Sequence, residues 1–215
     1  MDLFQLYKME KFSIREEFKN EIDEIWNALD FEKIPFLERG YAVQNEIIIG
    51  SFLFIGINPS FSGNLENKSH FYDNEQDGKI YSYFKKFQEI SKRADTPWSH
   101  IDLLYLRETN QKKIIEIFSN VNGKEFIYKQ LKLSKKIIEK SRPKIIVVSN
   151  SFARHLLHLD FQFEFDENIG THKIVEHQTL ASIPVFFTSM LTGQRALDLG
   201  SYERLIWHIK KVLKK

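Results

Sequence analysis

The sequence predicts an α/β fold, a three-layer αβα sandwich around a central, mostly parallel four-stranded sheet. Four short apolar runs are spread along the chain, and amphipathic helical patterns lie between them. Strands that alternate with helices are joined by right-handed crossovers, which makes their sheet mostly parallel. Ligands of such sheets bind beyond the carboxyl ends of the strands. The loops expected to form the site are therefore 58–78, 106–111, 149–154 and 187–200.

The first apolar run, 52–57, reads Phe-Leu-Phe-Ile-Gly-Ile and stops at Asn58 and Pro59. A short continuous apolar run of this kind is typical of a strand that is buried on both faces. The other predicted strands are 101–106, 144–149 and 183–188. The stretch 161–180 fits an additional hairpin, whose place in the sheet the sequence does not give.

The first predicted helix covers 13–30, because Ser13 with Glu16 three residues later forms a capping box and apolar residues follow at helical spacing. Pro143 is expected to end a later helix. The further helices are predicted at 79–93, 124–140, 151–159 and 201–213.

The length of 215 residues favours one domain, 1–215, with a helical extension at 1–45. The chain has no Cys, which excludes a disulfide framework and a Cys-ligated zinc or iron–sulfur site. The amino terminus lacks a secretory pattern and the apolar runs are too short to span a bilayer. We therefore expect a cytoplasmic monomer with no membrane partner, no metal and no organic cofactor. A net charge of +2 does not argue for nucleic acid, although a local basic groove remains compatible with it.

The segment 56–60, Gly-Ile-Asn-Pro-Ser, is the most informative loop. Pro59 disfavours a helical conformation at Asn58, so that the Asn58 side chain projects from the strand end into the ligand crevice. A carboxamide offers two donors and an acceptor, which can hold a water or read the edge of a base. A structural Asx turn that closes the strand explains the same residues.

The segment 187–195 follows the fourth strand and carries a second group of candidate residues. Ser189 and Thr192 offer hydroxyls to a phosphate, Arg195 offers a cation, and Leu191 is interpreted as an exposed apolar wedge. The start of a helix is the alternative interpretation of this segment.

The segment 142–154 ends a helix, runs through the third strand and begins another helix, with Asn150 or Ser151 as its cap. A helix amino terminus at a strand end can receive an anion. Ordinary α/β architecture also accounts for this pattern.

Together these three segments resemble the uracil-DNA glycosylase superfamily, over roughly residues 50–212. Residues 56–60 look like the Gly-Ile-Asn-Pro-Gly motif of its mismatch-specific branch, with Ser60 in place of the last glycine. The strand that begins at Pro143 looks like the Arg-Pro-Lys segment of the family. Residues 187–195 look like its second motif, usually His-Pro-Ser-Pro-Leu-Ser or Asn-Pro-Ser-Gly-Leu-Ser.

The resemblance implies a DNA glycosylase that flips a base out of the stack, because a glycosidic bond inside a duplex cannot be reached. Asn58 would orient the attacking water at the sugar C1′, and Leu191 would fill the gap left in the duplex. Phe71 would lie under the flipped base, with Phe61 as the alternative. The rest of the implied base-binding set is Gly56, Ile57, Pro59, Ser60 and Phe187, and the rest of the DNA-binding set is Ser189, Thr192, Gln194, Arg195, Asn150 and Ser151.

The sequence departs from the family at three places. Phe187 stands where the family has His or Asn and cannot donate a hydrogen bond to a base, and Thr188 replaces a proline. The segment 103–107 lacks the base-reading Asn that follows the second strand in the classical uracil branch. The sequence assigns no role to the histidines, among them His155, His158, His172 and His177.

Three functional hypotheses follow. The first is a glycosylase for uracil or another damaged or mismatched base in DNA. The second is a non-catalytic module of the same fold that binds nucleic acid or a nucleobase. The third is an unrelated α/β enzyme that acts on a small molecule. A basic groove beside the Asn58 pocket would separate the first two from the third.

Overall fold

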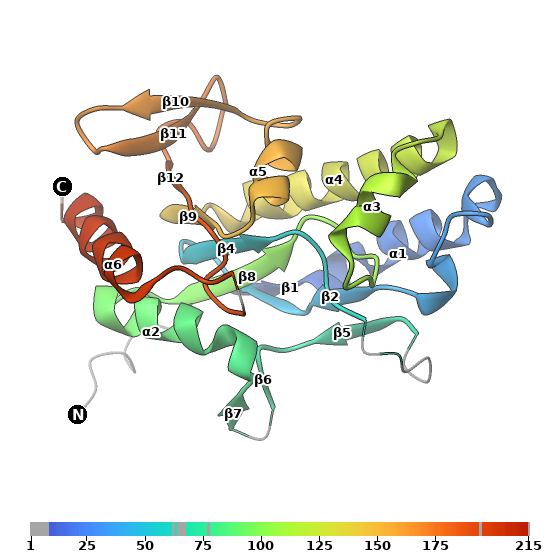
Figure 1. Ribbon diagram of the computed structural model, residues 1–215, viewed down its shortest axis with the longest axis horizontal. Helices are drawn as coiled ribbons and strands as arrows, with labels where there is room; N and C mark the ends of the chain where they lie inside the picture. Colours follow the sequence, from blue (N-terminus) through green and yellow to red (C-terminus); the bar gives the residue numbers. More distant parts are fainter. Residues whose placement is uncertain (1–8, 62, 64–67, 77, 194, 215) are drawn as a thin grey trace.

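The computed structural model describes residues 9–61, 63, 68–76, 78–193 and 195–214, and shows a mixed α/β architecture (Figure 1). A six-stranded, mostly parallel sheet forms its centre, in the order β10–β11–β12–β9–β4–β8. The strands are β4 (Phe52–Gly56), β8 (Trp98–Asp102), β9 (Ile145–Val148), β10 (Gln162–Asp166), β11 (Thr171–Val175) and β12 (Pro184–Phe187).

Strands β12, β9, β4 and β8 pair in parallel. Three of the predicted apolar runs coincide with β4, β9 and β12, whereas the run 101–106 overlaps β8 only at Ile101 and Asp102. The sheet has six strands rather than the predicted four. The stretch 161–180 folds into the antiparallel hairpin β10–β11, which joins the same sheet through the pairing of His172 with Val185. The hairpin covers an edge of β12 that would otherwise expose unpaired backbone groups.

The second strand ends earlier than predicted, at Asp102 instead of residue 106. After Asp102 the chain continues beside the end of β4, where the N–H of Leu103 donates to the carbonyl of Gly56 and that of Leu104 to Ile57, at 3.2 and 2.8 Å. Residues 103–106 are buried all the same. An apolar run therefore marked burial correctly but could not separate the strand from the buried loop that follows it.

The α-helices are α1 (Ile14–Asn27), α2 (Lys85–Ala94), α3 (Gln111–Ile117), α4 (Val121–Ser141), α5 (Ser151–Leu157) and α6 (Leu199–Leu213). Ser13 caps α1 as predicted, because its Oγ accepts the N–H of Glu16 at 3.2 Å. Helix α2 begins later than predicted, because the small hairpin of β6 (Glu75–Gln76) and β7 (Lys79–Ile80) and a 3-10 turn (Ser82–Phe84) precede it. Helix α3 was not predicted.

The segment 9–45 is more than a helical extension. It also contains β1 (Lys11–Ser13), β2 (Ala42–Gln44) and two 3-10 turns, at Leu29–Phe31 and Leu37–Arg39. Strand β1 pairs with β3 (Glu46–Ile48), and β2 pairs in parallel with β5 (His70–Tyr72). The pairing with β2 fixes β5 beside the carboxyl end of the central sheet, which matters for the site.

Helices cover both faces of the central sheet (Figure 1). Along β4, Leu53 and Ile55 join the apolar cluster of α1 and α4, whereas Phe52 and Phe54 join that of α2 and α6. Both clusters meet on one strand because successive side chains point to opposite faces. No helix in the described part of the chain is long and apolar enough to cross a membrane.

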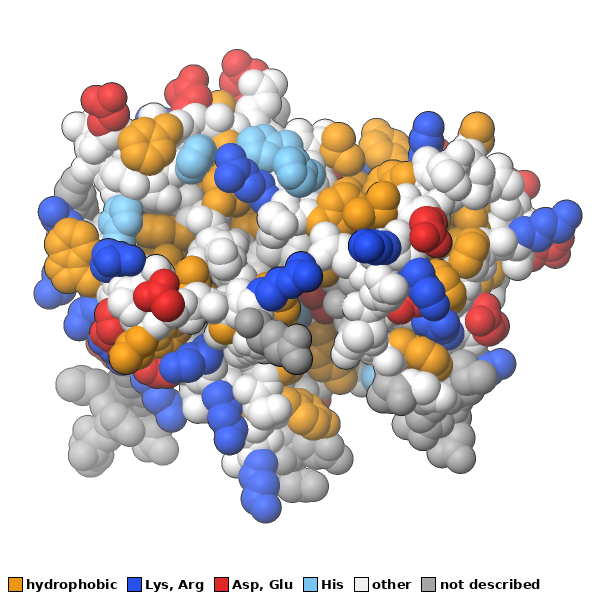
Figure 2. All heavy atoms as spheres, viewed as in Figure 1, with side chains coloured by type: hydrophobic (Ala, Val, Ile, Leu, Met, Phe, Trp, Pro, Cys, Tyr) orange, Lys and Arg blue, Asp and Glu red, His pale blue; other side chains and the backbone are white. Residues whose placement is uncertain are grey.

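One face of the molecule gathers histidine, cationic and hydrophobic side chains over the β10–β11 hairpin and α5 (Figure 2). Acidic side chains in this region lie toward the outer edge of the hairpin (Figure 2). The region over the hairpin and α5 therefore differs from the rest of the visible surface, where acidic and basic side chains are mixed (Figure 2).

Candidate functional site

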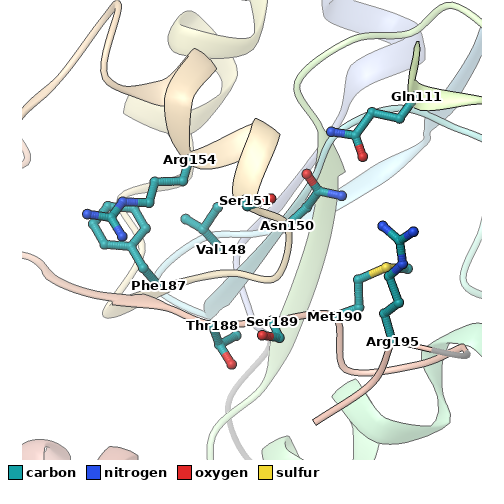
Figure 3. Close-up of a pocket in the computed structure, with 10 residues that line it drawn as sticks. All are labelled: Gln111, Val148, Asn150, Ser151, Arg154, Phe187, Thr188, Ser189, Met190 and Arg195. Atoms are coloured by element: carbon teal, nitrogen blue, oxygen red, sulfur yellow. The ribbon is translucent and has the colours of Figure 1, made fainter. Parts of the chain in front are cut away.

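Two adjoining cavities lie beyond the carboxyl ends of the parallel strands. The larger, of about 650 Å³, is walled by the segment 56–60 and is named here the central cavity. The smaller, of about 370 Å³, contains Arg154 and Arg195 and is named the arginine cavity (Figure 3). The two cavities adjoin each other, since Gln111, Asn150 and Met190 line both.

All five residues of the segment 56–60 line the central cavity. Gly56 is required there because an added Cβ would lie 2.2 Å from Asp102 Oδ1 and 3.1 Å from His100 Nε2. Register pairs Gly56 with Asp102 on the neighbouring strand β8. The missing side chain thus lets a carboxyl group lie against the end of β4.

The Asn58 side chain is held in one orientation by the loop after β8. Its Nδ2 donates to the carbonyl oxygens of Pro59 at 2.9 Å, Leu106 at 3.3 Å and Glu108 at 2.6 Å. All three partners are acceptors, so the amide nitrogen must face them and the amide oxygen must face elsewhere. Within the described residues Asn58 Oδ1 has no hydrogen-bond partner, and Asn58 lines the central cavity.

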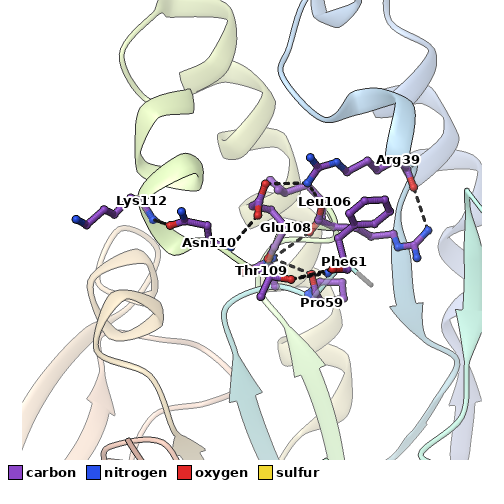
Figure 4. Close-up of polar contacts among 10 residues, drawn as sticks. Arg39, Pro59, Phe61, Leu106, Glu108, Thr109, Asn110 and Lys112 are labelled. Carbon is purple, nitrogen blue, oxygen red and sulfur yellow. Dashed lines mark hydrogen bonds and ion pairs between the residues drawn. The ribbon is translucent and has the colours of Figure 1, made fainter. Parts of the chain in front are cut away.

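The loop that holds Asn58 is itself braced by an ion pair and a hydrogen bond (Figure 4). Arg39 Nη1 lies 2.7 Å from Glu108 Oε2, and the N–H of Asn110 donates to Glu108 Oε1 at 2.7 Å. Burial alone would raise the pKa of Glu108, but the Asn110 N–H and Arg39 more than offset it and the pKa lies below its usual value. Glu108 is therefore ionised and fixes the loop on the rim of the cavity.

The buried polar residues of the central cavity are ones that sequence reasoning missed. His100 and Asp102 lie on either side of Ile101 in β8, are at most one-tenth exposed, and both line the cavity. His100 Nε2 lies 3.6 Å from Asp102 Oδ1, and neither ring nitrogen of His100 has a hydrogen-bond partner in the described structure. The sequence does contain a signal for this pair, namely two titratable residues beside Ile101 in a predicted buried segment. Burying a carboxylate or an imidazole costs free energy unless the group is hydrogen-bonded or paired.

Burial sets the protonation of this pair. Burial raises the pKa of Asp102 to about 7, although a hydrogen bond from Tyr72 acts in the opposite direction. Burial among the rings of Phe84 and Phe87, with centroids 5.1 and 5.7 Å away, lowers the pKa of His100 to about 3. Near neutral pH the cavity thus presents an uncharged imidazole and a carboxyl group that still holds its proton in part of the molecules.

The aromatic residues that line this cavity are Tyr72, Tyr81, Tyr83 and Phe84, and Phe71 is not among them. Phe71 faces the core and packs edge-on against Tyr41 at 5.7 Å, while its strand neighbours His70 and Tyr72 line the central cavity. The prediction for Phe71 was wrong by one residue, because alternation along β5 sends neighbours to opposite faces. Burial and the Asp102 carboxylate raise the pKa of Tyr72 well above its usual value, so its hydroxyl is a donor.

Phe61, the alternative to Phe71, also lies outside the lining of the central cavity. Its ring is covered by the guanidinium groups of Arg39 and Arg107, whose Cζ atoms lie 4.4 and 5.2 Å from the ring centroid. Its backbone is tied to the Thr109 hydroxyl at 3.0 Å. Phe61 therefore packs the rim of the loop.

The arginine cavity lies between the ends of β9 and β12 and the start of α5 (Figure 3). Arg154 lies over the ring of Phe187, with Cζ 4.7 Å from the centroid (Figure 3). Ser151 and Ser189 also line it, and Asn150 caps α5 by accepting the N–H groups of Phe152 and Ala153. No Asp or Glu occurs among the described residues that line this cavity, and Arg154 and Arg195 form no ion pair within the described structure.

The prediction of an exposed wedge at Leu191 was wrong. Leu191 is 4% exposed and belongs to the apolar cluster of α2 and α6. The loop folds back on itself, with the N–H of Leu197 donating to the Met190 carbonyl at 2.9 Å, and this turn directs Leu191 inward. Thr192 lines neither the central nor the arginine cavity, and Gln194 lies outside the described residues.

Neither a protein-family model nor a curated protein matches the chain. Among the described residues, no group of three or more His, Asp or Glu side chains is arranged to hold a metal ion.

Proposed function

We propose that this protein hydrolyses the N-glycosidic bond of uracil or another damaged or mismatched base in DNA. The target base enters the central cavity, and the flanking backbone phosphates lie in the arginine cavity. The proposal includes a three-layer αβα sandwich like that of the uracil-DNA glycosylase superfamily, which the sequence resembles in its Gly56–Ser60 motif.

The fixed orientation of Asn58 is the observation that carries the proposal. Three carbonyl acceptors hold its amide nitrogen, and its oxygen remains available at the cavity wall. A carbonyl oxygen in this position accepts a hydrogen bond from a water and aims it at the sugar C1′. The C1′–O bond forms as the C1′–N bond breaks, the base leaves with the bonding electrons and takes up the proton of Asp102, and the attacking water loses one proton to the solvent, from which Asp102 is protonated again. Holding the water in place lowers the entropic part of the barrier.

The buried end of the cavity supplies a donor to the leaving base. Negative charge grows on the base as the bond breaks, and a prepositioned donor in a dry site stabilises that charge. Protonated Asp102 is such a donor, because burial favours its neutral form, and the Tyr72 hydroxyl orients it by donating a hydrogen bond to the same carboxyl group. Asp102 would therefore supply the hydrogen bond to the base that Phe187 cannot make. Excision should therefore decrease as the pH rises through about 7, where Asp102 loses its proton.

The arginine cavity supports a nucleic acid over a small neutral substrate. Two arginines without ion pairs adjoin the Asn58 cavity, and the lining contains hydroxyl and amide groups but no described carboxylate. Arginine binds phosphate through two parallel hydrogen bonds. The two arginines therefore support a nucleic-acid ligand over the small-molecule substrate of the third hypothesis.

A second candidate function is a non-catalytic module that binds a nucleobase in nucleic acid. One observation favours it: the Asn58 amide nitrogen is already used to hold the loop. In this reading Asn58 is a structural residue, and the central cavity reads a base without breaking its bond.

The test is excision from labelled single-stranded and duplex oligonucleotides that carry uracil, hypoxanthine, or thymine opposite guanine, scored as abasic sites after alkali. Asn58→Ala should abolish excision, but it also removes three hydrogen bonds of the loop. Asp102→Asn keeps the shape of the side chain and is therefore the sharper variant. We expect it to lower excision at least about 10-fold, because its carbonyl and amide cannot release a proton toward the base.

Asp73→Asn is the matched control, since Asp73 is exposed and lies outside the lining of the central cavity. Its excision should equal that of the wild type. Excision that survives Asn58→Ala in a folded protein would rule out the assignment of the water to Asn58. Salt-sensitive DNA binding with no excision of any base would instead establish the binding module.

A further inference from the structure

A third cavity, of about 410 Å³, lies between the β10–β11 hairpin, the end of β12 and α6, and is named the hairpin cavity. Nothing in the sequence pointed to it, and the proposed reaction does not use it. Its wall combines aromatic and cationic side chains: Phe165, His172, Phe187, Arg154, Arg204 and His208.

Phe165 gives this cavity an open aromatic surface. It stands on β10 opposite His172 on β11 and is 58% exposed. The His172 ring meets it edge-on, with centroids 5.5 Å apart, and His172 in turn meets Phe187 at 5.0 Å. A large apolar ring left in water on a hairpin is a surface on which an unpaired base can stack.

The charge of the cavity suits a phosphate. Its lining includes Arg154 and Arg204, while no Asp or Glu occurs among the described lining residues. Arg154 forms no ion pair within the described structure, and it also lies on the wall of the arginine cavity. A guanidinium beside an aromatic ring is the combination that binds single-stranded nucleic acid, through the backbone and through stacking.

The cavity is built from braced parts. His208 Nε2 donates to the Ile169 carbonyl at 2.6 Å, which ties α6 to the turn of the hairpin. Gly170 makes this approach possible, since it has a φ of +69° and an added Cβ would meet His208 at 3.2 Å. The Thr171 hydroxyl donates to the Val185 carbonyl at 2.7 Å. The aromatic and cationic groups therefore stand on a defined framework.

The three cavities adjoin one another. The hairpin cavity shares Arg154, Phe187 and Thr188 with the arginine cavity, which in turn adjoins the central cavity through Gln111, Asn150 and Met190. Figure 2 shows histidine and cationic side chains gathered over the hairpin and α5. A strand with one nucleotide in the central cavity thus has a walled route to the hairpin.

The position of Leu191 indicates whether the bound nucleic acid is a single strand or a duplex. A protein that flips a base from a duplex profits from an apolar side chain that fills the gap, and Leu191 is buried in the core instead. A base can stack on Phe165 only when it is unpaired. Both observations favour a single strand over a duplex.

We propose that the hairpin cavity is a second nucleotide subsite, in which Phe165 stacks an unpaired base and Arg154 binds the phosphate that connects it to the nucleotide in the central cavity. The inference rests on the nucleic-acid part of the proposed function and not on its hydrolytic step. The substrate class is accordingly single-stranded DNA.

The test measures binding to an undamaged, fluorescently labelled oligothymidylate and to a duplex of the same length by anisotropy. Phe165→Ala should weaken single-strand binding about 5-fold or more, the alanine effect of a single stacked base, and change duplex binding less than about 2-fold. Phe165→Trp should keep the affinity for the single strand. The control is Tyr128→Ala, which removes an exposed aromatic ring from α4 and should change neither.

An equal loss of single-strand and duplex binding in Phe165→Ala would overturn the proposal, as would no loss in a variant that melts at the wild-type temperature. Excision assays keep the two proposals apart. Loss of single-strand binding in Phe165→Ala without excision by the wild type would leave the subsite standing and end the hydrolytic proposal. Excision by the wild type together with unaltered single-strand binding in Phe165→Ala would support the hydrolytic proposal and rule out the subsite.

Discussion

The central cavity and the two cavities beside it are built on opposite electrostatic plans. The central cavity contains its own carboxyl groups, Asp102 and Glu108, and balances them with buried hydrogen bonds and with Arg39. The arginine and hairpin cavities have cations and aromatic rings in their walls and no described carboxylate. The first needs a ligand that makes hydrogen bonds without charge, whereas the others need an anion.

This difference teaches how adjoining cavities can receive a nucleotide strand. Desolvation raises the pKa of Asp102 and lowers that of His100, so both favour their neutral forms against the face of a base. The arginines remain exposed and act through long-range attraction that salt weakens. Changes in the central cavity should therefore alter chemistry and stability, and changes in the other two should alter salt-dependent binding.

The largest effect is expected where the two strand ends touch. Gly56→Ala places a Cβ 2.2 Å from Asp102 Oδ1 and displaces the carboxyl group. We expect excision to fall below detection and the free energy of unfolding to decrease by about 1–3 kcal/mol, as for other overpacked sites. Abasic-site assays and urea denaturation measure the two. Gly200→Ala, whose Cβ meets only Asp198 Oδ1 at 3.2 Å, is the control. A Gly56→Ala variant that keeps its activity would show that the position of Asp102 does not matter for excision.

Leu191→Ala separates a core residue from a wedge. Because Leu191 is 4% exposed, its truncation should lower the free energy of unfolding by about 2–5 kcal/mol. Any remaining excision should keep the wild-type ratio between single-stranded and duplex substrates. Urea denaturation and parallel assays on both substrates give the two numbers. A stable variant that loses excision from duplex but not from single-stranded substrate would support the interpretation of Leu191 as a wedge.

Asp102→Asn tests the buried carboxyl group through the pH dependence of stability. The pKa of Asp102 is raised from 3.8 to about 7, so the folded protein keeps a proton that the unfolded chain releases between these values. This contribution to stability is complete below about pH 4 and is lost as the pH rises through about 7. The free energy of unfolding of the asparagine variant should thus increase relative to that of the wild type as the pH rises, by a few kcal/mol at most. Thermal unfolding from pH 4 to 8 checks it, and a pH-independent difference would contradict the raised pKa.

The smallest effect is expected at Arg154. Arg154→Gln removes one cation from the shared wall of the arginine and hairpin cavities and should weaken DNA binding several-fold. The slope of log K against log salt should fall by about 1, which corresponds to one phosphate contact. Arg15→Gln on α1 carries the same charge change away from the cavities and serves as control. An equal change of slope in both variants would mean that only net charge matters.

Elements whose signals are local could be predicted from the sequence. Three of the four apolar runs coincide with the parallel strands β4, β9 and β12, Ser13 and Asn150 cap their helices, and the stretch 161–180 contains a hairpin. Burial on both faces of a strand and the capping of a helix depend on nearby residues, so a single sequence records them. The segment 56–60 also reached the wall of the main cavity.

Only the tertiary structure decided which side chains meet. The register of β5 against β2 turned Tyr72 rather than Phe71 into the cavity, and a folded-back loop buried Leu191. The pairing of Gly56 with Asp102 brought a carboxyl group to the end of β4, and the hairpin joined the sheet to form a third cavity. These outcomes depend on contacts between segments far apart in the chain, where a shift of one residue in register reverses the face of every side chain.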